Sequence, residues 1–146
     1  MSGELLYLDS SALVKLVLPE TESEALLEGL AAWPIRVTSE LARVEVMRAV
    51  RRATAHLAAE RRVDEVIAGL HLLKIDSEVL SGAARLEPRT LRSLDAIHLA
   101  SALSLGADLG AIVIYDSNMA TAATGCGLHV LTPRPAGKSP ASNPYP

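Results

Sequence analysis

Apolar residues along this chain alternate between short continuous runs and longer stretches with a helical repeat. The runs have the length of buried strands and lie at residues 5–8, 35–37, 73–75, 111–115 and 128–131, of which 73–75 is the weakest. Apolar positions three and four residues apart predict helices at residues 21–32, 40–53, 58–72, 77–86 and 94–105. This alternation predicts an α/β fold with three layers, in which helices flank a parallel sheet of four to five strands.

Composition predicts one domain with an aliphatic core. The 146 residues are 49% hydrophobic but only 3% aromatic, and the segment PRPAGKSPASNPYP at 133–146 holds five prolines. We therefore expect a domain over residues 1–132 and a Pro-rich disordered tail over residues 133–146. The single cysteine, Cys126, excludes an intramolecular disulfide and a multi-cysteine zinc site.

Charge and hydropathy limit the partners of the chain. The net charge of −3 gives no case, over the whole chain, for binding to nucleic acid or to a membrane surface. No apolar run reaches the roughly 18 residues of a membrane span, and the N-terminus lacks the pattern of a signal peptide. These features predict a cytoplasmic protein without a membrane partner.

Two aspartates follow directly after runs that predict strands. Asp9 ends the run in LLYLDSSALVKL and Asp116 ends the run in AIVIYDSNMA, and each is followed by serine and a helical stretch. The carboxyl ends of parallel strands meet at one edge of the sheet, where ligands bind in open α/β folds. Aspartate is also a good helix N-cap, so capping alone is the alternative interpretation of each residue.

Two more acids lie among apolar or small residues on predicted helices. Glu45 stands at the margin of an apolar stripe in SELARVEVMRAVRR, which predicts a half-buried carboxylate. An ordinary ion pair with Arg48 or Arg52 is the alternative for Glu45. Asp95 falls in the first turn of the helix in RSLDAIHLASALSL, where the helix dipole alone would favour an acid.

Four acids in one pocket would need protons or cations, whereas each acid alone would not. If they met in one pocket, their repulsion would be on the order of 20 kcal/mol, more than the ~5–15 kcal/mol that stabilises a typical domain. Such a cluster must take up protons or hold cations. Carboxylate ligands without nitrogen or sulfur favour the hard ions Mg²⁺ and Mn²⁺.

The segments YLDSSALVKL, TSELARVEVMRA, LRSLDAIHLASAL and VIYDSNMATAA, in this order, resemble the PIN domain and, within it, the VapC-type toxins of toxin–antitoxin pairs. The resemblance covers about residues 5–131. It implies a parallel sheet between helices, acids that bind Mg²⁺ or Mn²⁺, and hydrolysis of RNA to 5′-phosphate and 3′-hydroxyl ends. It also implies a homodimer and an antitoxin partner that presents a basic side chain to the acidic pocket.

The resemblance assigns the four acidic positions of the family to Asp9, Glu45, Asp95 and Asp116. It implies that all four are catalytic residues. Asp9, Asp95 and Asp116 are the expected direct metal ligands, and Glu45 is expected to bind the ion directly or through water.

Several polar residues near the acids are candidates for supporting roles. Ser10 or Ser11 matches the small hydroxyl that often accompanies the first acid of the family. Many members carry another acid shortly after the fourth, where this chain has Asn118, which is expected to supply a carbonyl or to position a metal-bound water. His98 follows Asp95 by three residues but has no second histidine at matching spacing, which favours packing or hydrogen bonding near the site.

Arginines are concentrated in the segment between residues 43 and 62. RNA binding needs local rather than net charge, so Arg51 and Arg52 are predicted to contact the RNA backbone. A solvated helix surface, paired with nearby acids, is the alternative interpretation.

Two other functions are consistent with parts of the pattern. Phosphoryl-transfer domains of the haloacid-dehalogenase or receiver type also begin with a strand that ends in Asp, but the D-x-D motif and the paired acids that they use are absent here. A degenerate PIN-like module would use its acids to bind a partner or a structural ion without catalysis. The presence of all four acids argues against this second alternative.

Overall fold

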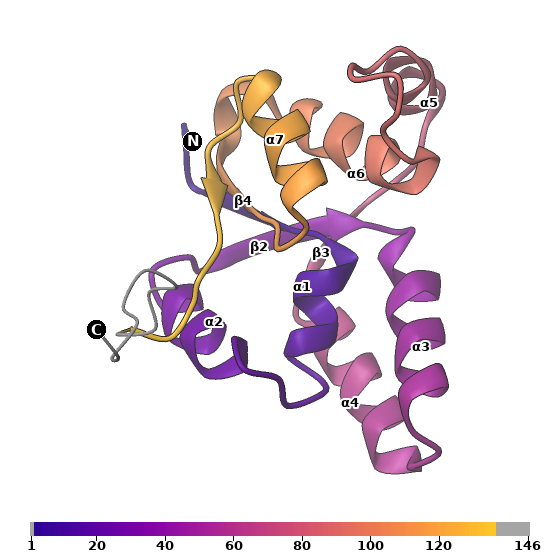
Figure 1. The fold of residues 1–146 in the computed structure, drawn as a ribbon, viewed down its shortest axis with the longest axis vertical. Helices are drawn as coiled ribbons and strands as arrows, with labels where there is room; N and C mark the ends of the chain where they lie inside the picture. The colour runs from indigo at the N-terminus through magenta and orange to yellow at the C-terminus, as the bar shows by residue number, and fades with distance from the viewer. Residues whose placement is uncertain (1, 137–146) are drawn as a thin grey trace, which may run out of the picture.

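Five parallel strands form one sheet in the order β3-β2-β1-β4-β5 (Figure 1). The computed structural model describes residues 2–136, and its strands are β1 (Leu5–Leu8), β2 (Ile35–Ser39), β3 (His71–Leu73), β4 (Leu109–Val113) and β5 (Val130–Leu131). All neighbouring strands are parallel, and Tyr7 of β1 is paired with Val37 of β2 and Ile112 of β4. The predicted α/β fold with a parallel sheet is confirmed, and β1 lies at its centre.

Helices cover both faces of this sheet (Figure 1). Those on one face are α1 (Ser10–Lys15), α2 (Ser23–Leu30), α3 (Ala42–Ala53) and α4 (Leu57–Ala68). Those on the other face are α5 (Ser77–Ala84), α6 (Ser93–Leu103) and α7 (Ser117–Gly125), and a short 3₁₀ helix, η1 (Gly106–Asp108), precedes β4. The sheet is therefore the middle of three layers.

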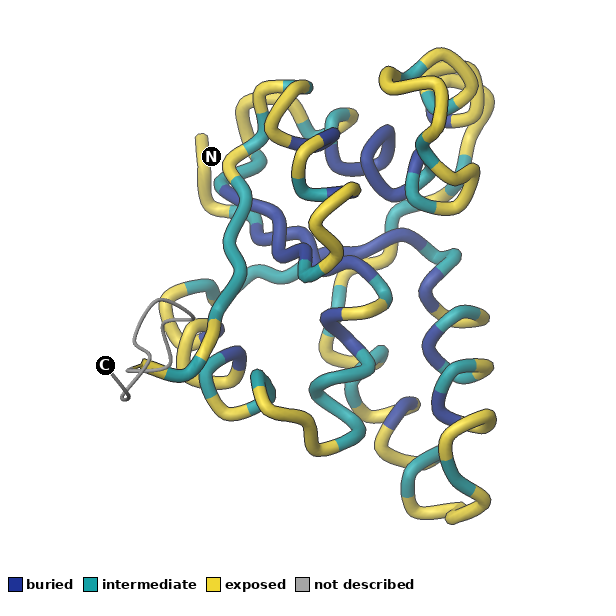
Figure 2. The backbone as a smooth tube through the Cα atoms, viewed as in Figure 1, coloured by how far each residue is buried: buried dark blue, intermediate teal, exposed yellow. Residues whose placement is uncertain are grey.

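The core has two halves because successive side chains of a strand point to opposite faces of the sheet. Leu6 and Leu8 of β1 pack into the apolar cluster under α1 to α4, whereas Tyr7 between them packs against α6 and α7. Figure 2 shows the central strands and the inner faces of the helices as the buried part of the chain. The strand ends, where the predicted acids lie, border this buried region.

The boundary between α4 and β3 differs from the prediction. The helix predicted over 58–72 ends at Ala68 with Gly69 at its C-cap, and residues 71–73, rather than 73–75, pair with β2. The leucines after Gly69 fit either periodicity, and hydrogen bonding to β2 decides in favour of a strand. β4 also lies two residues earlier than predicted, because its partner β1 begins at Leu5 and ends at Leu8.

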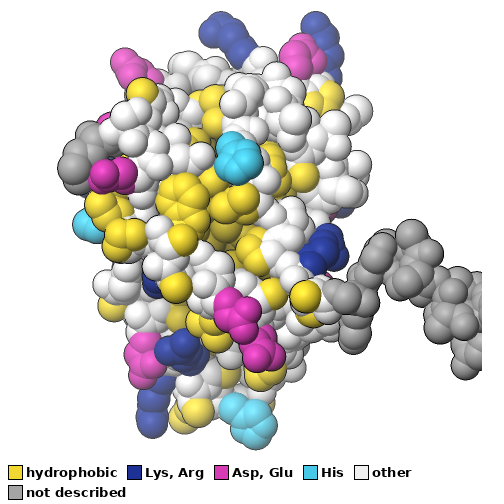
Figure 3. Space-filling model, turned by 90° about the vertical axis from the view of Figure 1, so that its left-hand side faces the viewer, with side chains coloured by type: hydrophobic (Ala, Val, Ile, Leu, Met, Phe, Trp, Pro, Cys, Tyr) yellow, Lys and Arg dark blue, Asp and Glu magenta, His cyan; other side chains and the backbone are white. Residues whose placement is uncertain are grey.

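The β5 edge of the sheet is short and partly covered. Val130 and Leu131 are half-buried, and apolar side chains remain visible on this side of the molecule (Figure 3). Beyond them, the Tyr115 hydroxyl donates to the carbonyl oxygen of Pro133 at 2.9 Å. Of the predicted tail, residues 133–136 are thus within the described part, and residues 137–146 lie outside the described residues. No helix in the described residues is long and apolar enough to cross a membrane.

One glycine of β4 is required by a close approach of the chain. A Cβ atom on Gly110 would contact the carbonyl oxygen of Gly3 and would lie 2.5 Å from the ring of Trp33. No other residue fits at this position without movement of the neighbouring backbone or of the indole ring. Gly110 thereby lets the N-terminal segment and Trp33 pack closely against β4.

Candidate active site

Asp9 is both a helix cap and a buried acid at the carboxyl end of β1. Its Oδ1 accepts the backbone N–H of Ala12 at 2.8 Å, which makes it the N-cap of α1. The Ser11 hydroxyl donates to the two carboxylate oxygens, at 2.9 and 3.1 Å. Asp9 is 3% exposed, and within residues 2–136 no Lys, Arg or His forms an ion pair with it. The capping interpretation is correct, but it leaves a buried carboxylate without a cation.

Burial raises the pKa of the Asp9 carboxyl to about 6. The hydrogen bonds from Ala12 and Ser11 favour the ionised form and lower this pKa, so they offset part of the effect of burial. The charge of Asp95 acts in the opposite direction and raises the pKa of Asp9. A proton or a cation at Asp9 would therefore lower the free energy of the folded protein.

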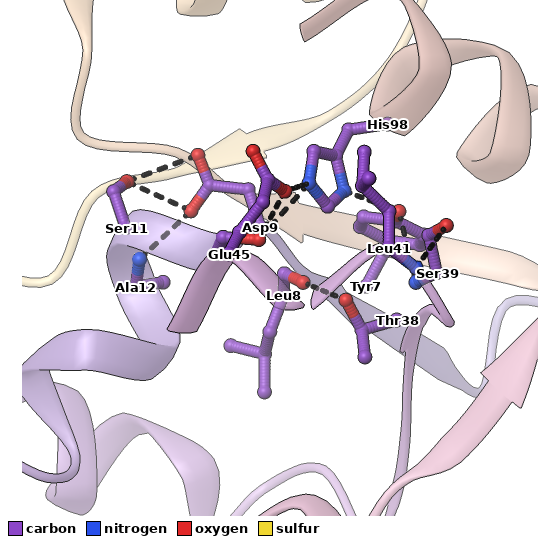
Figure 4. Close-up of polar contacts among 11 residues, drawn as sticks. Tyr7, Leu8, Asp9, Ser11, Ala12, Thr38, Ser39, Leu41, Glu45 and His98 are labelled. Atoms are coloured by element: carbon purple, nitrogen blue, oxygen red, sulfur yellow. Dashed lines mark hydrogen bonds and ion pairs between the residues drawn. The ribbon is translucent and has the colours of Figure 1, made fainter. Parts of the chain in front are cut away.

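Glu45 lies on α3, and its carboxylate is tied to two neighbours (Figure 4). His98 Nε2 lies 2.6 Å from Glu45 Oε1, and the Ser10 hydroxyl donates to the same oxygen at 2.6 Å. Burial alone would raise the pKa of Glu45, but hydrogen bonds from His98 and Ser10 outweigh burial and hold this pKa below its usual value. The half-buried position is as predicted. The alternative ion pair with Arg48 or Arg52 does not form within the described residues.

Asp116 and Asp95 stand at the starts of α7 and α6. Asp116 is exposed and is the N-cap of α7, because its Oδ1 accepts the N–H of Met119 at 2.8 Å. Asp95 is half-buried, and burial, together with the charges of Asp116 and Glu45, raises its pKa. Among residues 2–136 no hydrogen bond or ion pair holds the Asp95 carboxylate, so its oxygens are available to a ligand.

The four acids influence one another but do not form a complete cage for an ion. The charge of Asp95 acts on Asp9, and the charges of Asp116 and Glu45 act on Asp95. Within the described part of the chain, no three His, Cys, Asp or Glu side chains are arranged to hold one metal ion. Mg²⁺ keeps several waters and binds proteins through one or two carboxylates, so a partial set of oxygen ligands fits such an ion. The metal site stays a prediction, with buried Asp9 as its strongest donor.

Two surface hollows flank the acids. The first, about 690 Å³ in volume, lies beside α1, α3 and the start of α6, and its polar lining includes Ser10, Ser11, Glu45, Arg48, Arg52 and Arg92. The second, about 410 Å³, lies beside α6 and α7, and its lining includes Thr90, Arg92, Asp95, Asp116, Asn118 and Thr121. Asn118 thus stands beside the strand-end acid that precedes it in the sequence. Glu45 thus lines the first hollow, Asp95 and Asp116 line the second, and Arg92 lines both.

The two arginines predicted to contact RNA occupy different environments. Arg52 lines the first hollow, whereas Arg51 does not line it, and Arg51 Nε lies 3.7 Å from Glu60 Oε1. Arg92, which was not predicted as a site residue from the sequence, lines both hollows. Its position three residues before Asp95 was the available signal.

Two further residues lie close to the site. Tyr7 reads as an apolar strand residue, yet its hydroxyl lies 2.7 Å from His98 Nδ1. Lys15 Nζ lines the first hollow but is paired with Glu20 at 2.9 Å and with Glu22 at 3.0 Å. These two pairings neutralise Lys15, so the free positive charge in this hollow comes from the arginines.

Comparison with known proteins gives consistent matches over most of the chain. The family model described as PIN domain matches residues 6–124. Ribonuclease VapC46 of Mycobacterium tuberculosis is 48% identical over 130 residues, which cover 88% of this chain and 97% of the relative. Ribonuclease VapC35 of the same species is 42% identical over 137 residues, with the same coverage of each chain.

Solved structures agree with the fold. The crystal structure of Mycobacterium tuberculosis VapC20, a Sarcin-Ricin loop cleaving toxin, superposes with a TM-score of 0.69 at 17% identity and covers 89% of this chain and 99% of that chain. A toxin–antitoxin complex from Klebsiella pneumoniae superposes with a TM-score of 0.68 at 21% identity, over 88% of this chain and 97% of that chain. The family model and the relatives more than 40% identical show that the chain belongs to the PIN domain family.

Proposed function

We propose that this protein is a ribonuclease toxin of a toxin–antitoxin pair and that it hydrolyses RNA phosphodiester bonds with a divalent cation. The observation that carries the proposal is the buried Asp9 carboxylate, which has no cation partner in the described residues and lies in the field of Asp95. The relatives named Ribonuclease VapC support the same reaction class. The match to the PIN domain over residues 6–124 favours a nuclease over the phosphoryl-transfer alternative.

The ion in this proposal is Mg²⁺, with Mn²⁺ as its substitute. Asp9, Asp95 and Asp116 are the candidates to hold it directly, one or two at a time as Mg²⁺ prefers, and Glu45 would hold it directly or through water. When bound, such an ion lowers the pKa of a coordinated water and so supplies hydroxide near neutral pH. The donors are all carboxylate oxygens, which is the ligand type that these hard ions prefer.

The chain's own residues have defined tasks in this reaction. Ser11 and the N–H of Ala12 hold the Asp9 carboxylate in one orientation. Glu45 Oε2 accepts no hydrogen bond within residues 2–136, so it is free to accept one from the attacking water. Arg52 and Arg92 supply positive charge for the RNA backbone beside the acids. Attack of water forms a bond to phosphorus, the bond to the 3′ oxygen breaks, and that oxygen leaves with a proton.

The proposal includes two protein partners. An antitoxin would cover the acids and present a basic side chain to them, because a guanidinium can replace the charge of a metal ion at a carboxylate cluster. A second copy of the chain would complete a homodimer. Co-expression with the adjacent reading frame tests the first partner: relief of growth arrest supports an antitoxin, and arrest in both cases contradicts it.

The direct test compares RNA cleavage by the wild type, Asp9→Asn and Asp95→Asn in the presence of Mn²⁺. Loss of cleavage in both variants, with an unchanged circular dichroism spectrum, supports the nuclease. A folded wild type that binds Mn²⁺ but cleaves no RNA would support the degenerate module instead. Equal cleavage by all three proteins would show that the activity comes from a contaminant or from another site.

A further inference from the structure

A chain of hydrogen bonds connects the central strand to the candidate site (Figure 4). The Tyr7 hydroxyl of β1 lies 2.7 Å from His98 Nδ1, and His98 Nε2 on α6 lies 2.6 Å from Glu45 Oε1 on α3. Tyr7 is fully buried and His98 is 2% exposed, so water does not compete for these contacts. The three side chains thereby join the middle layer and both helical layers at one point.

The contacts among Tyr7, His98 and Glu45 assign a role to each nitrogen of the His98 ring. A Glu45 carboxylate only accepts hydrogen bonds, so the contact with Glu45 Oε1 requires a proton on His98 Nε2. The phenolic oxygen of Tyr7 accepts the backbone N–H of Ser39 at 3.1 Å, which leaves its own proton free to donate. Nδ1, on the opposite side of the ring, contacts the Tyr7 hydroxyl. Both ring nitrogens therefore have protein partners.

The contacts at Glu45 hold one oxygen and leave the other free. Oε1 receives hydrogen bonds from both His98 and Ser10, each at 2.6 Å. Two short bonds on one oxygen restrict the rotation of the carboxylate, because turning it would break both. Oε2 has no hydrogen-bond partner in the described residues, and Glu45 lines the first hollow. The free oxygen is therefore held in a defined place at the edge of the site.

We propose that His98 is a positioning residue: Tyr7 orients its ring through Nδ1, and Nε2 holds Glu45 Oε1 so that the free oxygen of Glu45 faces the reacting groups. This inference rests on the proposed function. The ring is not itself a metal ligand, because both of its nitrogens are occupied by protein partners. In metal sites, too, the partner of one ring nitrogen fixes the orientation of a histidine ring.

Two substitutions of His98 separate positioning from packing. His98→Gln places an amide N–H where Nε2 lies and keeps a donor for Glu45, whereas His98→Asn is too short to reach Glu45. We expect His98→Asn to lower kcat by ~10–100-fold with little change in KM, and His98→Gln to recover most of that loss. Ser104→Ala is the matched control, because the Ser104 hydroxyl, at the C-cap of the same helix, donates to the carbonyl oxygen of Ser101 at 2.6 Å. Equal loss in the Asn and Gln variants, at equal thermal stability, would overturn the proposal.

Two readouts do not depend on RNA cleavage. In metal-free protein with ¹⁵N-labelled histidine, the His98 shifts should show a protonated Nε2, and Tyr7→Phe should move the Nδ1 shift. Calorimetric titration with Mn²⁺ should show weaker binding to His98→Asn than to His98→Gln. An unprotonated Nε2, or equal Mn²⁺ affinity in the two variants, contradicts the positioning role. A wild type that meets both expectations but does not cleave RNA would contradict the proposed function alone.

Discussion

Replacing Asp9 by asparagine is expected to stabilise the protein while abolishing the proposed activity. Asparagine keeps an Oδ1 atom that can accept the N–H of Ala12, and it caps helices about as well as aspartate. The hydroxyl of Ser11 can still donate to that oxygen. The substitution therefore preserves the cap and removes only the charge, which separates the role of Asp9 in the fold from its role in the site.

The size of the gain follows from the pKa of Asp9. Burial raises this pKa from 3.8 to about 6, and each pKa unit corresponds to ~1.4 kcal/mol, so ionised Asp9 costs the folded state ~3 kcal/mol at neutral pH. The pKa of Asp9 is higher in the folded than in the unfolded state. The free energy of unfolding of the wild type therefore falls by this ~3 kcal/mol as the pH rises from about 3.8 through about 6. The penalty is about 2 kcal/mol at pH 5 and about 3 kcal/mol at pH 7. The stability difference between the variant and the wild type should therefore widen by about 1 kcal/mol between these pH values.

Urea unfolding in EDTA at pH 5 and pH 7 measures this difference directly. We expect Asp9→Asn to be the more stable protein at both pH values and to gain most at pH 7. Asp116→Asn is the control, because Asp116 caps α7 with the same kind of contact but is exposed, and it should change the free energy of unfolding less. A variant that is no more stable than the wild type at pH 7, with a difference that does not grow with pH, would refute the reasoning.

Three other predictions follow from the same structure. Mn²⁺ at 100 times its Kd should raise the Tm of the wild type by the equivalent of ~2.7 kcal/mol of stability, and it should raise the Tm of Asp9→Asn much less. Equal Tm shifts in the two proteins would contradict a metal site at Asp9. Arg52→Glu should weaken binding of single-stranded RNA in fluorescence anisotropy and reduce its salt slope by ~0.7 per lost phosphate contact, whereas Arg51→Glu, beside Glu60, should have the smaller effect. Gly110→Ala should lower the free energy of unfolding by ~1–3 kcal/mol, because Trp33 and the Gly3 carbonyl block the added Cβ, whereas Gly125→Ala, whose Cβ meets open space, should not. The opposite order of the two variants would show that β4 tolerates the methyl group.

The order of strands and helices could be predicted because each element carries its own periodicity. The central run at residues 5–8 is buried on both faces of the sheet, and such a strand reads as continuously apolar. The predicted helices agree with α2, α3, α5 and α6 within two residues at each end. The segment around Leu70 and Leu72 could not be divided correctly, because its leucines fit both repeats and the hydrogen bonds that select a strand come from β2.

The positions of the acids at strand and helix starts could also be predicted, since each lies next to a recognisable element. Their mutual placement could not be derived from spacing, because it depends on how α3 and α6 pack on the sheet. The contact between Tyr7 and His98 joins residues 91 positions apart, and neither residue has a local pattern that points to the other. In the same way, Arg51 and Arg52 are equivalent in the sequence, and only the packing of α4 beside α3 distinguishes them.

The strand-end aspartates could serve as helix caps, as metal ligands or as both, and the sequence does not separate these roles. Burial of the charge in the structure is a criterion that separates them. Capping requires an oxygen that accepts one N–H, and a neutral asparagine supplies it. At exposed Asp116 the charge remains hydrated, so its contribution to folding is accounted for by capping, without a cation. At Asp9 the charge is buried and has no cation within residues 2–136, and no gain in capping compensates for a penalty of ~3 kcal/mol. A cationic ligand would explain a residue whose charge opposes folding while its capping oxygen supports it, and Asp9 is therefore the acid at which the proposed metal binding is most directly coupled to folding stability.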